Sequence, residues 1–226
     1  MVVDGRTLHK SLRRPGDMKR AFWPSVVFYD KQWEIVNSVR DNRETIVVAG
    51  NQLGKDYIAG FIALSFFLRP QMYFADEYVR EIEAQKSVSN PNPHTVRIIT
   101  TSVKDEHINV LWSEIGRYIN NCRFGLEHKD GGPLIVNHRQ IRKVINGQLD
   151  TVSYLKGMVT EKPEGLAGHH AAYTLMIADE ASGVENEFYE AGQGWMKKFL
   201  AIGNPMPCAN FFYRGVEAGD AHATSA

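Results

Sequence analysis

The chain has 226 residues, of which 43% are hydrophobic and 23% charged, and its formal net charge at pH 7 is zero. This length suits one sizeable α/β core, and the composition is that of a globular protein rather than a disordered or fibrous one. The balanced charge argues against a protein that wraps nucleic acid permanently, and the lack of any apolar run of ~18 residues argues against a membrane span.

The first 28 residues are predicted to form a basic arm that leads into an extended segment. A solvated, flexible arm is the favoured interpretation, and an arm that contacts DNA or a neighbouring subunit is the alternative. The aromatic stretch 22–29, broken by Pro24, is expected to lie extended against the core. Residues 29–226 are then predicted to form the globular domain. The dense basic run consists of Arg6, His9, Lys10, Arg13, Arg14, Lys19 and Arg20.

The next stretch predicts a helix, a strand and a second helix. After Asp30, a predicted N-cap, apolar side chains recur at helical spacing over 31–40. The β-branched run 45–48 predicts a buried strand. An apolar helix is expected over 57–68, because the following Arg69-Pro70 cannot continue it.

The turn between that strand and that helix has the layout of a phosphate-binding loop. In such a loop, backbone N–H groups and the positive helix end hold phosphate oxygens, and the lysine reaches the terminal phosphates. The octet departs from G-x-x-x-x-G-K-[ST] at both ends, with alanine for the first glycine and aspartate for the magnesium-binding hydroxyl. Alone, it fits an ordinary strand-turn-helix equally well. The octet is Ala49-Gly50-Asn51-Gln52-Leu53-Gly54-Lys55-Asp56.

Strands and helices alternate along the rest of the chain. This order predicts a mostly parallel central sheet flanked by helices, with antiparallel additions at an edge. Helices are predicted over 75–86 and 104–120, strands over 95–100, 173–178 and 198–202, a surface loop over 87–93, and short edge strands over 134–136, 140–145 and 150–154.

Two of the predicted strands end in polar residues that suit a nucleotide site. Asp179 and Glu180 follow one strand, where an aspartate can orient a magnesium shell and a glutamate can polarise the attacking water. Asn204, in Gly-Asn-Pro, follows another and can bond that water. Taken singly, the acidic pair is commonly solvated charge and Gly-Asn-Pro a plain turn. Their combination favours a nucleotide site, because these residues and Lys55 are expected to converge from neighbouring strand ends at one crevice.

This combination resembles the ATPase half of the large terminase subunit of tailed bacteriophages. The resemblance extends from about Tyr29 to the end of the chain. It implies an α/β P-loop NTPase fold of the additional-strand type, related to RecA and helicases, and ATP-driven translocation of double-stranded DNA into a preformed procapsid. The residues that carry it are 50–55, 163–171, 176–184, 203–205 and Phe211-Phe212-Tyr213.

The resemblance assigns ATP to the loop and Mg²⁺ to the acidic residues. It implies that Gln32 reads the adenine while the octet from Ala49 to Asp56 cradles the phosphates. It implies a catalytic role for Lys55 on the β- and γ-phosphates. Asp179 would hold magnesium through its water shell, and Asp56 can ligate the ion as a hard oxygen donor.

The same resemblance makes Glu180 the catalytic carboxylate and Asn204 the residue that couples hydrolysis to movement. Many relatives carry an arginine at the position of Asn51, so transition-state charge would here need an arginine from a neighbouring subunit, worth ~10³–10⁵ in rate. Arg139 and Arg142 lie in the region that the predicted sheet does not place. Asp56 adds negative charge near the β-phosphate, so we expect weak ATP binding without magnesium and a steep magnesium dependence.

The implied partners are double-stranded DNA, the portal protein, the small terminase subunit and further copies of the chain. These copies would form a ring on the capsid and be monomeric in isolation. The expected location is the cytoplasm of the infected bacterial host, with transient docking on the procapsid, and two cysteines without ligand spacing agree with a reducing compartment. Relatives continue into a nuclease domain; because the sequence stops at Ala226, neither that domain nor nuclease activity is expected of this chain.

Two other functions stay open. A helicase- or recombinase-type ATPase acting on single strands fits the strand-helix order, although Asp-Glu-Ala-Ser with Gly-Asn-Pro favours packaging. A nucleotide-binding assembly module with little hydrolysis is suggested by Ala49 and Asp56. His169 and His170 lack a third ligand at suitable spacing, so their loop is expected to face a subunit interface or the nucleotide rather than hold a metal.

Overall fold

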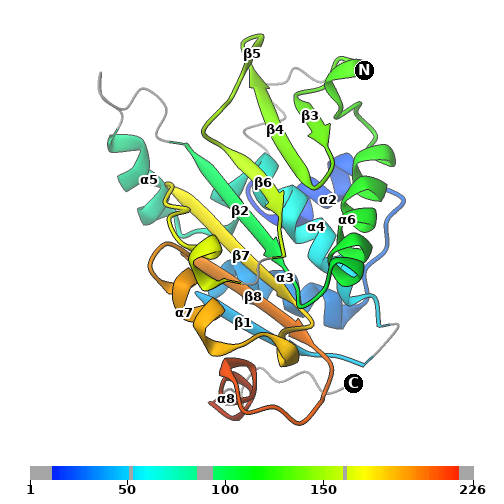
Figure 1. Ribbon diagram of the computed structural model, residues 1–226. Helices are drawn as coiled ribbons and strands as arrows, with labels where there is room; N and C mark the ends of the chain where they lie inside the picture. Colours follow the sequence, from blue (N-terminus) through cyan, green and yellow to red (C-terminus); the bar gives the residue numbers. More distant parts are fainter. Residues whose placement is uncertain (1–11, 51–52, 86–93, 160–161, 219–226) are drawn as a thin grey trace.

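The apolar runs of the sequence build one eight-stranded sheet with helices packed on both faces (Figure 1). The computed structural model describes residues 12–50, 53–85, 94–159 and 162–218. The predicted surface loop 87–93 lies outside these residues. The strands are β1 (Glu44–Val48), β2 (Val96–Thr101), β3 (Leu134–Asn137), β4 (Gln140–Ile145), β5 (Gln148–Leu149), β6 (Tyr154–Gly157), β7 (Tyr173–Asp179) and β8 (Lys198–Gly203).

The strand order is β1-β8-β7-β2-β6-β4-β3, with β5 paired to β4. The five strands from β1 to β6 in this order are mutually parallel, whereas β4 is antiparallel to both β6 and β3. Strand β8 therefore lies between β1 and β7. The sequence predicted Lys55 and the acidic pair at neighbouring strand ends, whereas in the structure β8 separates the two strands. The expected antiparallel edge is confirmed for β3 and β4. The third predicted segment, 150–154, forms a strand only from Tyr154 onward, and this strand is antiparallel to β4 but parallel to β2.

Helices α3, α4 and α6 contact one face of the sheet, and α7 and η3 lie over the other (Figure 1). The predicted helices over 31–40, 57–68, 75–86 and 104–120 are all present. The helices are α2 (Pro15–Phe22), α3 (Asp30–Asp41), α4 (Lys55–Leu68), α5 (Asp76–Ala84), α6 (Asp105–Asn120), α7 (Asn186–Gln193) and α8 (Phe211–Ala218), with 3₁₀ turns η1 (Pro70–Tyr73), η2 (His128–Asp130), η3 (Pro163–Leu166) and η4 (Ala181–Gly183).

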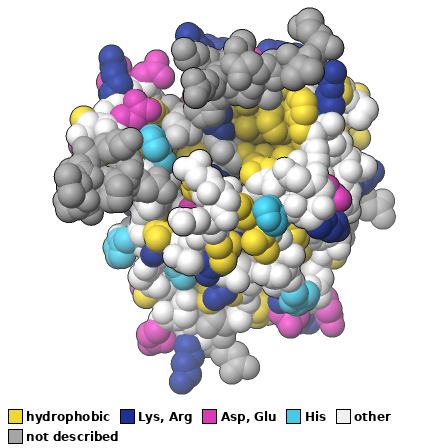
Figure 2. Space-filling view, turned by 90° about the horizontal axis from the view of Figure 1, so that it is seen from above, with side chains coloured by type: hydrophobic (Ala, Val, Ile, Leu, Met, Phe, Trp, Pro, Cys, Tyr) yellow, Lys and Arg dark blue, Asp and Glu magenta, His cyan; other side chains and the backbone are white. Residues whose placement is uncertain are grey.

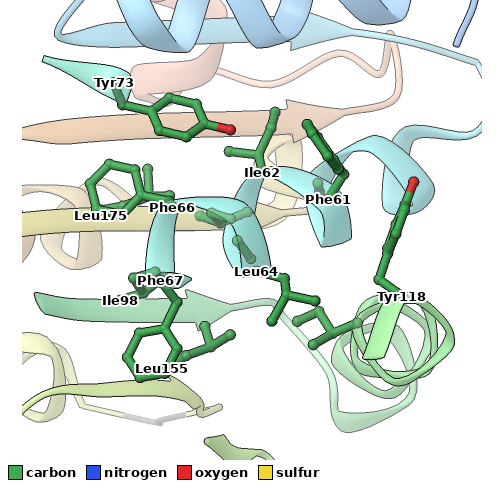
Figure 3. Close-up of a cluster of buried hydrophobic side chains, with 14 of the residues drawn as sticks. Phe61, Ile62, Leu64, Phe66, Phe67, Tyr73, Ile98, Tyr118, Leu155 and Leu175 are labelled. Carbon is green, nitrogen blue, oxygen red and sulfur yellow. The ribbon is translucent and has the colours of Figure 1, made fainter. Parts of the chain in front are cut away.

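Helix α4 forms the centre of the larger core because every residue from Ile58 to Phe67 is buried. A helix that is apolar all round must be enclosed by other elements. Side chains of β2, β6 and β7 pack against it on one side, and α6 approaches closely at Gly60, where a Cβ would lie 3.3 Å from the backbone of the facing helix. Figure 3 shows this packing, with α4 side chains directed toward Ile98, Leu155 and Leu175. The loop before α4 is thus attached to a firmly held helix.

The N-terminal stretch differs from the predicted solvated arm. Residues 1–11 lie outside the described part, but from Leu12 onward the chain packs on the core, and the short helix α2 was not predicted. Met18 and Trp23 are buried, and the Trp23 indole donates a hydrogen bond of 2.7 Å to the carbonyl of Tyr118. The solvated arm is therefore wrong for residues 12–23. The predicted extended segment 22–29 is present only in part, because Phe22 ends α2, residues 24–25 form a turn, and Val27 and Tyr29 are exposed.

Seen from above the view of Figure 1, the molecule carries a hollow lined by hydrophobic side chains (Figure 2). This hollow lies away from the carboxyl ends of the parallel strands, where the loop after β1 is found. None of the helices in the described residues is long and apolar enough to cross a bilayer.

Candidate functional site

The loop after β1 leads from the sheet into the first turn of α4. The Ala49 N–H donates to the Gly203 carbonyl at 3.0 Å, so the alanine that replaces the first glycine extends the β1–β8 pairing. Gly54 adopts a left-handed conformation with φ of 72° and caps α4, a backbone geometry that favours glycine. The unpaired N–H groups of a helix start attract anions. Gly50 and Leu53 flank the tip, while Asn51 and Gln52 lie outside the described residues.

Gln32 of α3 is buried against this loop. Its Oε1 accepts a hydrogen bond of 3.3 Å from the Tyr29 N–H. Its Nε2 lies so close to Gly54 that a Cβ built there would be 2.8 Å from it. The sequence prediction that Gln32 belongs to the loop's surroundings therefore agrees with its position, while its role toward adenine stays a prediction.

A polar network joins the ends of three strands. Lys55, only 8% exposed, forms an ion pair with Glu180 Oε1. The other carboxylate oxygen of Glu180 accepts a hydrogen bond of 3.2 Å from the Asn204 amide. The Asn204 Oδ1 is buried and has no hydrogen-bond partner among the described residues, which suits a group that meets a substrate or a water there. Lys55 is the first residue of α4, Glu180 directly follows β7 and Asn204 directly follows β8.

Glu180 is held in an unusual backbone conformation. Its φ of 51° is left-handed, which is uncommon for a residue with a side chain and carries strain. The 3₁₀ turn η4 follows directly, and the Asn210 side-chain amide lies within hydrogen-bond distance of the carbonyls of Ala181, Ser182 and Val184. Asn210 therefore fixes the segment that follows Glu180. No local sequence pattern singles out this asparagine, because its partners lie 26–29 residues away.

Two further carboxylates, Asp56 and Asp179, sit beside this network. Burial raises the pKa of Asp179 to about 7, and the negative charges of Asp56 and Glu180 add to the rise against the opposing effect of Lys55. Burial likewise raises the pKa of Asp56. Two repelling carboxylates with raised pKa values fit a hard divalent cation, which takes few protein oxygens and completes its shell with water and phosphate. Within the described ranges no three His, Cys, Asp or Glu side chains cluster as a metal site, so protein ligands beyond this pair are not indicated.

Other residues singled out by the sequence have partners away from this network. His169 shares a hydrogen bond of 2.6 Å with the Tyr154 hydroxyl and packs edge-on to Trp195. Arg139 pairs with Asp105 at 2.7 Å. The lysine, the acidic pair and the asparagine expected at one crevice are thus brought together, whereas the histidine loop has contacts of its own.

No protein-family model matches the sequence, and no curated protein matches it. Solved structures do match. The large terminase ATPase domain of Thermus phage P74-26 superposes with a TM-score of 0.63 at 14% identity, over 94% of this chain and 78% of that one. A mutant of the same domain gives 0.61 at 16% identity, over 89% and 74%. The HK97 bacteriophage large terminase gives 0.54 at 12% identity, and the present chain covers 43% of it.

These likenesses establish the fold. The chain has the mixed α/β architecture of the phage large terminase ATPase domains, with a mostly parallel central sheet flanked by helices. Within this sheet, β8 lies between β1, which precedes the loop, and β7, which ends at Asp179. The structural resemblance predicted from the motifs is confirmed at this level.

Proposed function

We propose that this chain is an ATP-hydrolysing motor domain that drives double-stranded viral DNA into a preformed procapsid. The observation that carries the proposal is the network of Lys55, Glu180 and Asn204 at three strand ends, in a fold shared with large terminase ATPase domains. The proposed partners are the DNA, the portal protein, the small terminase subunit and further copies of the chain on the capsid. The proposed setting is the cytoplasm of the infected host.

The network suggests how ATP binding prepares hydrolysis. Without nucleotide, Lys55 and Glu180 neutralise each other in a largely buried ion pair. Phosphate oxygens at the start of α4 compete for the lysine, because they carry more negative charge than one carboxylate. Glu180 then loses its cationic partner but keeps the hydrogen bond from Asn204. A carboxylate freed in this way is a stronger base toward a water near the γ-phosphate.

Asp179 and Asp56 are the residues that would hold Mg²⁺ in this scheme. Bound magnesium supplies charge neutralisation of the phosphates. The two carboxylates repel each other when both are ionised, and a divalent cation removes that repulsion. This arrangement supports the expectation that nucleotide affinity depends steeply on magnesium.

The test of the proposal is ATP turnover by the whole chain, with and without long double-stranded DNA and portal protein. We expect magnesium-dependent turnover that double-stranded DNA increases, and a loss of roughly 100-fold or more in Glu180→Gln. Stimulation by single strands alone would favour the helicase-type alternative. Nucleotide binding without turnover would favour the assembly module. If the chain neither bound nor hydrolysed ATP, the ATPase proposal would be refuted altogether.

Asp56→Ser tests the second departure from the loop pattern. ATP affinity is measured over a series of magnesium concentrations for both proteins. We expect the serine variant to bind ATP more tightly at low magnesium, because one negative charge near the phosphates is gone. Coincident curves would show that Asp56 neither repels phosphate nor ligates the ion.

A further inference from the structure

One face of the sheet carries cationic side chains on three adjacent strands. The register pairs Arg97 of β2 with Tyr154 of β6. On the other side of β6, the antiparallel β4 register, continued by one residue beyond the pair Ile141–Leu155, brings Arg142 level with Tyr154. Lys156 lies two residues farther along β6 and opposite Gln140. Paired residues, and residues two apart on a strand, point to the same face of a sheet. Arg97, Tyr154, Arg142 and Lys156 therefore share one face.

This face is only partly covered over β6 and β4, where Arg97, Arg142 and Lys156 are half-buried. In the described part of the chain, α4 and α6 lie behind these strands in Figure 1, and no helix is drawn in front of them. The opposite face holds Leu155, Ile98 and Ile141, which are buried in the core with α4. An antiparallel or mixed edge with one covered face and one polar face is a common arrangement. The exposed parts of the three cationic side chains are thus available to a partner.

The cations of this face are oriented but not neutralised. Arg97 Nε donates to the Val152 carbonyl at 3.2 Å, and Arg142 Nη1 donates to the Thr151 carbonyl at 2.7 Å. None of the ion pairs among the described residues includes Arg97, Arg142 or Lys156. The nearby turn contains Asp150, but its carboxylate accepts the N–H groups of Val152 and Ser153. Two arginines and a lysine therefore present positive charge outside the ion pairs of the described residues.

The aromatic side chain in this row is not free to stack on a base. The Arg97 guanidinium lies 5.3 Å from the centre of the Tyr154 ring, and the Tyr154 hydroxyl is bonded to His169. Single-strand readers on sheet faces need exposed aromatic rings as stacking platforms. A row of cations without such a platform suits phosphates, whose contacts carry no sequence information.

We propose that the cationic face formed by Arg97, Arg142 and Lys156 binds the phosphate backbone of double-stranded DNA without regard to sequence. Across the row the two arginines are two strands apart, roughly 10 Å, and Lys156 is about 7 Å farther along its strand. This spread matches several phosphates of a duplex, which carries a charge per ~1.7 Å of its axis. The proposal rests on the proposed motor function and locates its DNA contact away from the ATP site.

The test measures the affinity of the whole chain for a short duplex of arbitrary sequence between about 50 and 200 mM salt. Each of Arg97→Gln, Arg142→Gln and Lys156→Gln should lower the salt slope by ~0.9 and weaken binding by roughly 8-fold at 0.1 M salt. The triple variant should lose about 500-fold. Arg43→Gln, which removes an exposed cation before β1, is the matched control and should leave both quantities unchanged.

Thermal unfolding and ATP turnover without DNA are measured on the same proteins. Lys156→Gln removes no hydrogen bond found in the described residues, so its melting temperature should equal that of the parent chain. Unchanged DNA affinity in the triple variant, or an equal loss in Arg43→Gln, would overturn the proposed site while intact ATP turnover left the ATPase standing. A single-stranded oligonucleotide bound more tightly than the duplex would also overturn it. Absence of turnover in the parent chain would instead count against the proposed function.

Discussion

Asp179 is expected to destabilise the nucleotide-free protein above neutral pH. The residue is 4% exposed, and burial together with the charges of Asp56 and Glu180 raises its pKa from 3.8 to about 7. Between these two values the folded chain keeps a proton that the unfolded chain has lost. The free energy of unfolding therefore falls as pH rises through this window, by at most about 4 kcal/mol at 1.36 kcal/mol per pKa unit.

Asp179→Asn removes this titration. In chelator and without nucleotide, its unfolding free energy relative to the parent chain should rise by about 3 kcal/mol between pH 5 and pH 8, since about two pKa units of the window lie above pH 5. Urea denaturation at several pH values measures the difference. Asp130→Asn, at an exposed carboxylate in η2, is the control and should show no such trend.

Magnesium provides the second half of this test. Saturating Mg²⁺ should narrow the gap at pH 8, because an ion that binds the folded state alone stabilises the parent chain. A difference between Asp179→Asn and the parent that is the same at pH 5 and pH 8 would refute the reasoning, as would a variant less stable at pH 8 than at pH 5 relative to the parent.

Three further substitutions probe the supports of the site. Asn210→Ala leaves the carbonyls after Glu180 without their amide, so we expect about 2 kcal/mol lower stability in urea and reduced turnover with ATP affinity retained. Asn204→Asp sets a second carboxylate against Glu180, and steady-state kinetics should show turnover lowered roughly 100-fold; unchanged turnover would remove Asn204 from the mechanism. Gly54→Ala should cost more than the ~1–2 kcal/mol of a left-handed alanine, because its Cβ also meets a glutamine amide at 2.8 Å, whereas Gly147→Ala, with φ of 77° and open space around it, should cost the backbone part alone.

Local patterns in the sequence were sufficient to predict most of the regular elements. Helix α4 ends where Arg69-Pro70 stops it, and the strands β1, β7 and β8 coincide with short apolar runs bounded by turn residues. The helices α2, α7 and α8 are eight residues long each, too short to show a clear period, and they were missed. Propensity and periodicity are properties of short stretches of sequence. They therefore predict individual helices and strands, provided that the element is long enough to show a period.

The arrangement of the strands required the folded chain. Strand β8 is the last in the sequence, yet it lies between β1 and β7, and no local pattern contains that order. Its position explains why Asn204 can reach Glu180. Two other features likewise depend on tertiary contacts. They are the hydrogen bonds from the Asn210 amide to the segment after Glu180, and the ion pair of Lys55 with Glu180 across 125 positions. The sequence was sufficient to predict Lys55, Glu180 and Asn204 as site residues, but not the ion pair and the hydrogen bond that join them.

The strand that carries the phosphate-loop candidate has a single pairing partner. In the described ranges β1 pairs with β8 alone, whereas β7 is paired on both sides in the middle of the sheet. Amides on the unpaired side of β1 should therefore exchange with deuterium through small local openings, and those of β7 through global unfolding alone. The side of the site formed by β1 and its loop should therefore open locally at low free-energy cost. The side formed by β7, which positions Asp179 and Glu180, should stay in place while the loop moves.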